Sequence, residues 1–263
     1  MKHFRPRLSR RAFWVLCALL VCLRLALTGF QQAYIWVGGA PLDDELMFRA
    51  ANHITAGQWL GAYDYLTLSK AMFFPVWLAL LHALHLPYLI SGAALWCGAA
   101  LLAAFAFSTL WRKKDPAQGR VLTLGLFATL AFLPSSWAAY TLRVYRDNIF
   151  PALCLYFFAG MAGMALRAVF TPEKPLWPWL AAAGAGLACG YLDREDAGLF
   201  LLPFAAAATV IVAVVLASKR RWKALAAQVI PYVMLGVGVL TFCTLNYTHY
   251  GVFALSDFSE GSF

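Results

Sequence analysis

The segment Pro41-Leu42-Asp43-Asp44-Glu45-Leu46-Met47-Phe48 follows the first of several long apolar stretches in this chain. Its three consecutive acids stand where an apolar helix would leave a membrane. Lys70 and a second, shorter apolar run beginning at Ala71 come after it. A long apolar helix, followed by a cluster of acids and then a short apolar helix, predicts a loop at a membrane surface. The rest of the chain is organised around that loop.

The composition is that of a membrane protein. Hydrophobic residues make up 62% of the 263 residues and charged residues 13%, whereas about 25% of an ordinary soluble domain is charged. The net charge of +9 is carried by short basic clusters between apolar segments, so it indicates topology and not a nucleic-acid partner. The six cysteines lie in apolar segments without Cys-x-x-Cys spacing, and we expect them to be buried small hydrophobic residues.

Seven apolar segments approach the roughly 20 residues that a helix needs to cross a bilayer. They predict an all-α polytopic helix bundle with transmembrane helices at 12–36, 87–111, 120–138, 149–170, 176–192, 197–217 and 224–245. Residues 1–245 are expected to form one transmembrane domain, with an uncleaved first span. Residues 246–263 are expected to form an outer loop, and the absence of a closing helix there is typical of the N-terminal portion of a longer protein.

Basic residues predict which loops share a side of the membrane. Lys and Arg are in excess on cytoplasmic loops, which predicts a cytoplasmic N-terminus, with the basic loops 112–119 and 218–223 on the same side. Only one span then fits between residue 41 and Arg112. The apolar run 71–86 would cover only about 24 Å as a helix, so we expect it to lie at the outer interface. Of the 12 acidic residues, only Asp115 and Glu173 then face the cytoplasm.

The first outer loop, residues 37–86, has two interpretations. Residues 45–56 predict a helix with an apolar stripe of Met47, Ala50, Ala51 and Ile54. In one interpretation Asp44 is only the N-cap of this helix, with Glu45 paired to Arg49 four residues later.

In the other interpretation, Asp43 or Asp44 is a general base at the membrane edge, where a hydroxyl acceptor meets a lipid-borne donor. Lys70 would then hold a phosphate. The alternative for Lys70 is that its ammonium merely extends to the interface.

Two further outer loops carry candidate groups. Arg143 and Arg146 have guanidinium forks that suit phosphate oxygens, and Asp147 could orient an acceptor or share a metal with Asp44. Arg194 and Glu195 stand before the span at 197–217. The alternative for the charges of the second loop is that they are merely solvated at the lipid headgroups. The alternative for Glu195 is that it only interacts favourably with the dipole at the start of a helix. Arg24, inside the first span, is expected to face the bundle and to pair with an outer-loop acid.

The run Asp43-Asp44-Glu45-Leu46-Met47-Phe48-Arg49-Ala50, followed by Gly57-Gln58-Trp59 and by Lys70 to Trp77, resembles the first outer loop of the GT-C superfamily of membrane glycosyltransferases. This superfamily includes protein O-mannosyltransferases, aminoarabinose transferases and lipopolysaccharide-core glycosyltransferases. The resemblance covers about residues 10–215. The chain departs from the pattern at Ala71-Met72, where many members have prolines.

The resemblance implies a sugar transferred from a polyprenyl-phosphate donor to a lipid, glycan or protein acceptor, on the outer side of a bacterial inner (plasma) membrane. It implies Asp44 as the catalytic base with Asp43 and Glu45 beside it, and Lys70 as a phosphate contact. The family often has an acid where Asp147 stands, and an arginine followed by an acid where Arg194 and Glu195 stand. With the guanidinium groups of the second loop, these residues give the expected substrate-binding set: Glu45, Lys70, Arg143, Arg146, Asp147, Arg194 and Glu195. The resemblance implies no certain cofactor, since some members use a divalent metal and others do not. The alternatives are a transporter or flippase, in which the same charges line a path, and a non-catalytic membrane scaffold.

Overall fold

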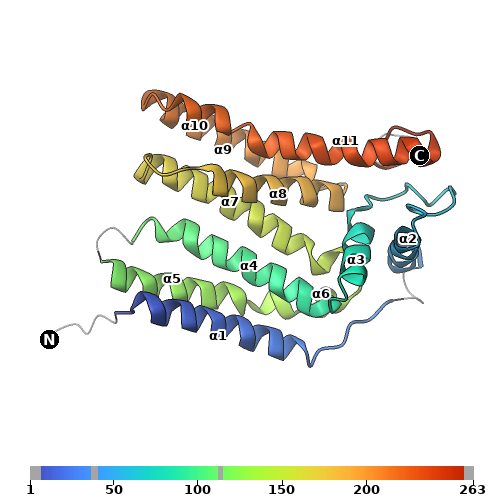
Figure 1. Cartoon of the computed structure of the whole chain (residues 1–263), viewed down its shortest axis with the longest axis horizontal. Helices are drawn as coiled ribbons and strands as arrows, with labels where there is room; N and C mark the ends of the chain where they lie inside the picture. Colours follow the sequence, from blue (N-terminus) through green and yellow to red (C-terminus); the bar gives the residue numbers. More distant parts are fainter. Residues whose placement is uncertain (1–6, 37–40, 112–114, 258–263) are drawn as a thin grey trace.

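The computed structural model describes residues 7–36, 41–111 and 115–257 (Figure 1). Regular structure in these residues is helical, and an isolated bridge between extended segments joins Tyr34 to Arg143. Some residues used in the sequence predictions lie outside the described part: the basic residues at positions 2, 5 and 112–114, the start of the first outer loop at 37–40, and the last residues, 258–263.

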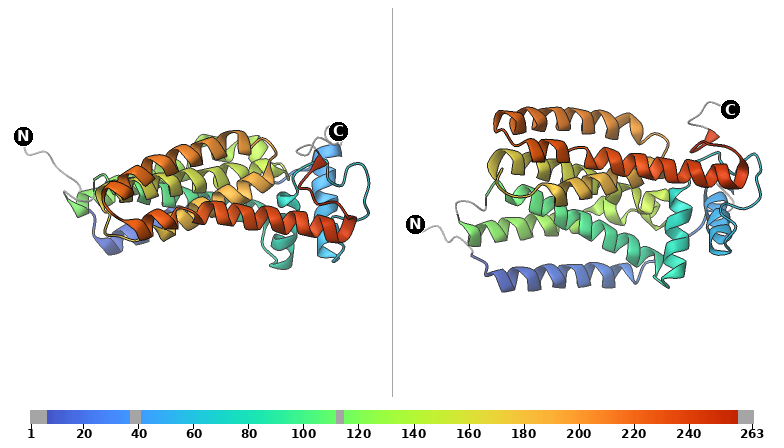
Figure 2. Two further views of the ribbon diagram at one scale, coloured as in Figure 1. Left: turned by 90° about the horizontal axis from the view of Figure 1, so that it is seen from above. Right: turned by 45° about the horizontal axis from the view of Figure 1, so that its top comes forward.

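Long helices run back and forth along one axis and form a bundle (Figures 1 and 2). They are α1 (Arg10–Thr28), α4 (Tyr88–Ser108), α5 (Pro116–Ala131), α7 (Phe150–Phe170), α8 (Trp177–Asp193), α9 (Gly198–Ser218) and α11 (Ile230–Tyr250), the last preceded by the short α10 (Trp222–Ala227). Five segments of the described chain are long and apolar enough to cross a membrane: α1, α4, α7, α9 and residues 222–250. The all-α class is therefore confirmed, with five candidate membrane-spanning segments. α5 and α8 have 16 and 17 residues, so the count of seven spans stays a prediction.

Several predicted boundaries were wrong. The span predicted at 224–245 is divided into α10 and α11, and α11 continues to Tyr250, into the predicted outer loop 246–263. The first span was expected to reach residue 36, but α1 ends at Thr28 because the chain then turns and Tyr34 pairs with the second outer loop. The helix predicted at 120–138 begins earlier, at Pro116, because the Asp115 carboxylate accepts hydrogen bonds from the amides of its first turn. It ends at Ala131, before the 3-10 turn η2 (Pro134–Trp137).

The centre of the bundle is the contact of α7 with α8. Gly160 and Gly186 allow the two backbones to approach: a Cβ on Gly186 would lie 2.4 Å from the amide nitrogen of Phe157, and one on Gly160 2.5 Å from that of Ala183. The outer helices instead expose large aliphatic side chains, as Val210, Ile211 and Val214 do on α9 at 63% or more. Such a surface suits a lipid environment.

The cysteines follow the prediction in part. Cys17, Cys97 and Cys243 are buried. Cys154 and Cys189 are half-buried, and Cys22 is exposed.

Two short helices lie across one end of the bundle (Figures 1 and 2). α2 (Leu46–Thr55) buries Met47, Ala50 and Ala51, as its stripe predicted, and Gly57 follows its end at φ +76°. α3 (Phe73–Ala83) is shorter than the predicted 71–86, and its 11 residues cover about 16 Å. These helices and the segments between the long helices form the surface that carries the predicted site residues.

We predict that Gly186→Ala destabilises the bundle, since its methyl group must push the backbones of α7 and α8 apart. The expected loss is about 1–3 kcal/mol, measured as unfolding monitored by tryptophan fluorescence in detergent. Gly236→Ala is the matched control: a Cβ there meets nothing within 4 Å, and alanine is the better helix former. Equal stability of the two variants would contradict the close packing.

Candidate functional site

Backbone pairing brings the first and second outer loops together. The Val144 amide donates to the Tyr34 carbonyl at 2.9 Å, and the Tyr34 amide donates to the Leu142 carbonyl at 3.2 Å. The Tyr88 hydroxyl, at the start of α4, donates to the Arg143 carbonyl at 2.7 Å. Arg143 is thereby held beside η1 (Pro41–Glu45), a single π-helical turn that carries the acidic run.

Asp44 is fully buried and bound to Arg143. Arg143 Nε donates to Asp44 Oδ2 at 2.9 Å, and Arg143 Nη2 contacts Asp44 Oδ1, so the pair is bidentate. The Trp36 amide donates to Asp44 Oδ2 at 2.8 Å. The hydrogen bond to Asp44 raises the pKa of Arg143. Asp44 is thus an anchor that joins the two loops.

The capping interpretation of Asp44 is wrong. α2 begins at Leu46, and Glu45, which precedes it, makes no side-chain cap. Asp44 directs its carboxylate to Trp36 and Arg143 instead. The pairing expected between Glu45 and Arg49 is also replaced, because Arg49 lies 3.4 Å from the carboxylate of Asp64.

Asp43 lies on the accessible side of the same turn. Its carboxylate forms an ion pair with Lys70, and its second oxygen lies 3.7 Å from Arg143 Nη2. The side chains of Asp43 and Lys70 are 30% and 27% exposed. Burial lowers the pKa of Lys70 and the charge of Arg146 lowers it further, whereas Glu195 acts in the opposite direction. This pair is therefore only partly buried, unlike Asp44.

Tyr145 and Arg146 connect this pair to the third outer loop. The Tyr145 hydroxyl lies 3.5 Å from Lys70 Nζ and 3.4 Å from Asp43 Oδ1, and it accepts from Arg146 Nη2 at 2.7 Å. Arg146 is 6% exposed and pairs with Glu195 at 2.9 Å. Glu195 in turn accepts from the Ala71 amide at 2.6 Å, just before α3. We call this set the ion-pair network: Asp43, Asp44, Lys70, Arg143, Tyr145, Arg146 and Glu195.

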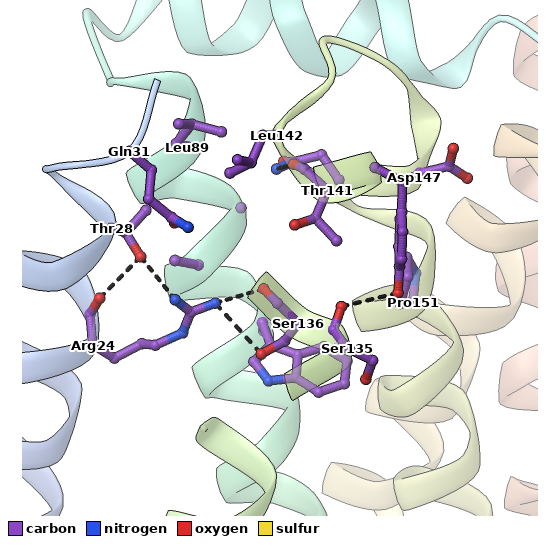
Figure 3. A pocket seen from close by; sticks show the side chains of 15 residues that line it. Arg24, Thr28, Gln31, Leu89, Ser135, Ser136, Thr141, Leu142, Asp147 and Pro151 are labelled. Atoms are coloured by element: carbon purple, nitrogen blue, oxygen red, sulfur yellow. Dashed lines mark hydrogen bonds between the residues drawn. The ribbon is translucent and has the colours of Figure 1, made fainter. Parts of the chain in front are cut away.

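Asp147 and Arg194 form a neighbouring pair. Arg194 Nη1 lies 3.2 Å from Asp147 Oδ1, and Arg194 Nε lies 3.1 Å from Asp196 Oδ1. Asp147 borders a cavity of about 50 Å³ whose opposite side is formed by Arg24 (Figure 3).

Arg24 faces the bundle, as expected, and is 2% exposed. The expected pairing with an outer-loop acid is wrong. Arg24 donates to Thr28 Oγ1 at 3.0 Å and to the Ser136 carbonyl at 2.7 Å (Figure 3). Its guanidinium also stacks 3.5 Å from the Trp137 ring centroid. Neutral oxygens and an aromatic face thus contact a cation for which the described residues supply no paired carboxylate, and its buried Nε has no hydrogen-bond partner among them.

Most residues predicted for the site therefore meet. The structure brings Asp43, Asp44, Lys70, Arg143, Arg146 and Glu195 into direct contact, places Asp147 and Arg194 next to them, and leaves Glu45 exposed. Sequence reasoning missed Tyr145, whose hydroxyl connects Asp43, Lys70 and Arg146. The sequence signal that could have identified Tyr145 is its position between Arg143 and Arg146 in the same loop.

The residues present do not fit a divalent metal. In the described part of the chain no three His, Cys, Asp or Glu side chains gather as metal ligands. The carboxylates of Asp43, Asp44, Asp147 and Glu195 each face a lysine or arginine instead. We derive no step through a metal.

We predict that Arg143→Gln destabilises the protein by about 3–5 kcal/mol, because it leaves the buried Asp44 carboxylate unpaired. Arg49→Gln removes an exposed pair and is expected to cost about 1 kcal/mol or less. Thermal and denaturant unfolding of the two variants in the same detergent compare the losses. A loss no larger for Arg143→Gln than for Arg49→Gln would argue against the anchoring role.

No protein-family model, curated protein or solved structure matches this chain. The function proposed next therefore depends on the chain's own residues and on the resemblance of its first outer loop.

Proposed function

We propose that this chain is a GT-C-type glycosyltransferase that transfers a sugar from a polyprenyl-phosphate donor to a lipid, glycan or protein acceptor. The supporting observation is the convergence of three loops. Residues chosen from the sequence for catalysis and phosphate binding, from positions as far apart as Asp43 and Glu195, form one network at one end of the bundle.

The proposal includes seven membrane spans and a cytoplasmic N-terminus in a bacterial inner membrane. The alternating directions of the long helices support it, because they bring the loops at 29–87, 132–149 and 194–197 to one end (Figure 1). The opposite end carries basic residues such as Arg7, Lys174 and Arg221. α5 and α8 would span about 24–26 Å, somewhat less than the ~30 Å hydrocarbon core. α2 and α3, lying across the end, suit an interfacial position.

Asp43 is better placed than Asp44 to act as the base. Asp44 is fully buried, and Arg143 and the Trp36 amide occupy its carboxylate oxygens, which leaves it no path to an acceptor. Asp43 is partly exposed and faces Lys70. In the proposed reaction Asp43 takes the proton of the acceptor hydroxyl while that oxygen bonds to the sugar's anomeric carbon. The bond between the anomeric carbon and the carrier phosphate breaks.

Lys70 couples donor binding to the freeing of this base. In the structure Lys70 is neutralised by Asp43, so an arriving carrier phosphate competes with Asp43 for the ammonium. Binding of the phosphate then releases Asp43 toward the acceptor, and Lys70 stabilises the phosphate as it leaves. Tyr145 lies within 3.5 Å of both groups and positions them.

One observation favours a second candidate, a non-catalytic membrane scaffold. The residue that the resemblance implies as the base, Asp44, is fully buried and makes a bidentate ion pair with Arg143. Such a pair is also what a purely structural connection between loops would need. The two candidates differ in whether the accessible Asp43 is required for chemistry.

The test is release of polyprenyl phosphate from a panel of polyprenyl-phosphate sugars by the full chain in proteoliposomes supplied with membrane extract as acceptor. This product is the same whichever sugar and acceptor are used. We expect Asp43→Asn to lower the rate at least ~100-fold, since positioned bases contribute about 10²–10⁴. Asp64→Asn, which alters another acid of the same loop, should remain near the wild-type rate.

Asp43→Asn and Asp44→Asn are measured separately. If both variants keep the wild-type rate, neither carboxylate is the catalytic base. A wild-type chain that binds the donors without releasing polyprenyl phosphate would favour the scaffold.

A further inference from the structure

A wide cavity lies at the end of the bundle opposite to the ion-pair network. Its volume is about 680 Å³, roughly twenty times the ~30 Å³ that a water molecule occupies in the liquid. The loop between α7 and α8, the turn after α9, and α10 form its walls (Figure 1). We call it the basic cavity, because Lys174, Arg220, Arg221 and Lys223 line it against one acid, Glu173.

The cations of the basic cavity are available to a ligand. Within the described chain, Lys174, Arg220 and Lys223 are exposed, and none of them forms an ion pair with a carboxylate. Arg221 donates from one Nη to the Pro172 carbonyl, which fixes its side chain while neutralising no charge. The contrast with the ion-pair network is clear, because each lysine and arginine there has an acidic partner.

The other walls of the basic cavity are apolar and aromatic. Trp177 and Trp222 are 64% and 63% exposed, and Leu176, Ala224 and Ala227 also line the cavity. Tryptophan is enriched at the depth of lipid headgroups, where its ring contacts both apolar and polar groups. Cations beside exposed tryptophans at the ends of apolar helices match a molecule with an anionic head and an apolar body.

We propose that the basic cavity binds the headgroup of an anionic phospholipid, with the phosphate at Arg220, Arg221 and Lys223 and the glycerol and first methylenes against Trp177 and Trp222. The excess of positive charge selects an anionic over a zwitterionic lipid, because juxtamembrane lysines and arginines are attracted to anionic headgroups. The site is separate from the proposed sugar-transfer site, so either can fail without the other.

The experiment measures the dissociation constant of short-chain phosphatidylglycerol for the full chain in a neutral detergent. Short-chain phosphatidylcholine and glycerol phosphate are the comparison ligands. Arg220→Gln/Lys223→Gln removes two charges from the cavity. Arg10→Gln/Arg11→Gln removes two exposed charges from the same end, at the start of α1, and is the matched control.

We expect the cavity variant to weaken phosphatidylglycerol binding about 25-fold, or about fivefold for each charge, with the control variant within about twofold of wild type.

Equal weakening by both variants, or equal binding of phosphatidylcholine, would overturn the site. Binding of glycerol phosphate as tight as that of the lipid would overturn the assignment to a lipid. Added salt should weaken the binding of phosphatidylglycerol to the wild-type chain. A dissociation constant that does not change with salt would also overturn the proposal, and this test needs no variant.

Discussion

The buried ion pair of Asp44 with Arg143 is the contact on which the outer end of this protein depends. A carboxylate and a guanidinium removed from water are each costly, and only close, fully hydrogen-bonded geometry repays that cost. Here both oxygens of Asp44 are used, one of them twice, and the Arg143 carbonyl is itself held by Tyr88. The pair fixes the acidic turn against the second outer loop, and this places Asp43 beside Lys70.

The two ends of the bundle handle charge differently. At the network end, acids and bases neutralise one another over a few ångströms, so a charged substrate has to exchange partners with groups already paired. At the other end, the cations around the basic cavity have no carboxylate partners within the described chain. An anionic ligand therefore meets unpaired cations at the second end, whereas at the first it has to displace an acid.

The sequence predicted the helical class, most of the long helices and the charged residues of the network, though not Tyr145, because hydropathy and charge are local properties. It failed where a distant contact decides local structure. Residues 29–36 are apolar enough to continue α1, yet Tyr34 is held in extended backbone by residues 142–144. Asp44 stands where an N-cap is expected, yet its carboxylate accepts hydrogen bonds from Arg143. Arg24 was expected to pair with an acidic residue. It instead contacts the Ser136 carbonyl and the Trp137 ring, which lie far along the chain.

The separation of 99 residues between Asp44 and Arg143 has a consequence for biogenesis. When the acidic turn emerges from the ribosome, its partner has not been synthesised, and α4 and α5 must be made before Arg143 can arrive. An unpaired buried carboxylate is strongly disfavoured, so the turn around Asp44 cannot close before Arg143 has been made. The contact between the two loops is therefore a late step of folding, after α4 and α5 have been synthesised.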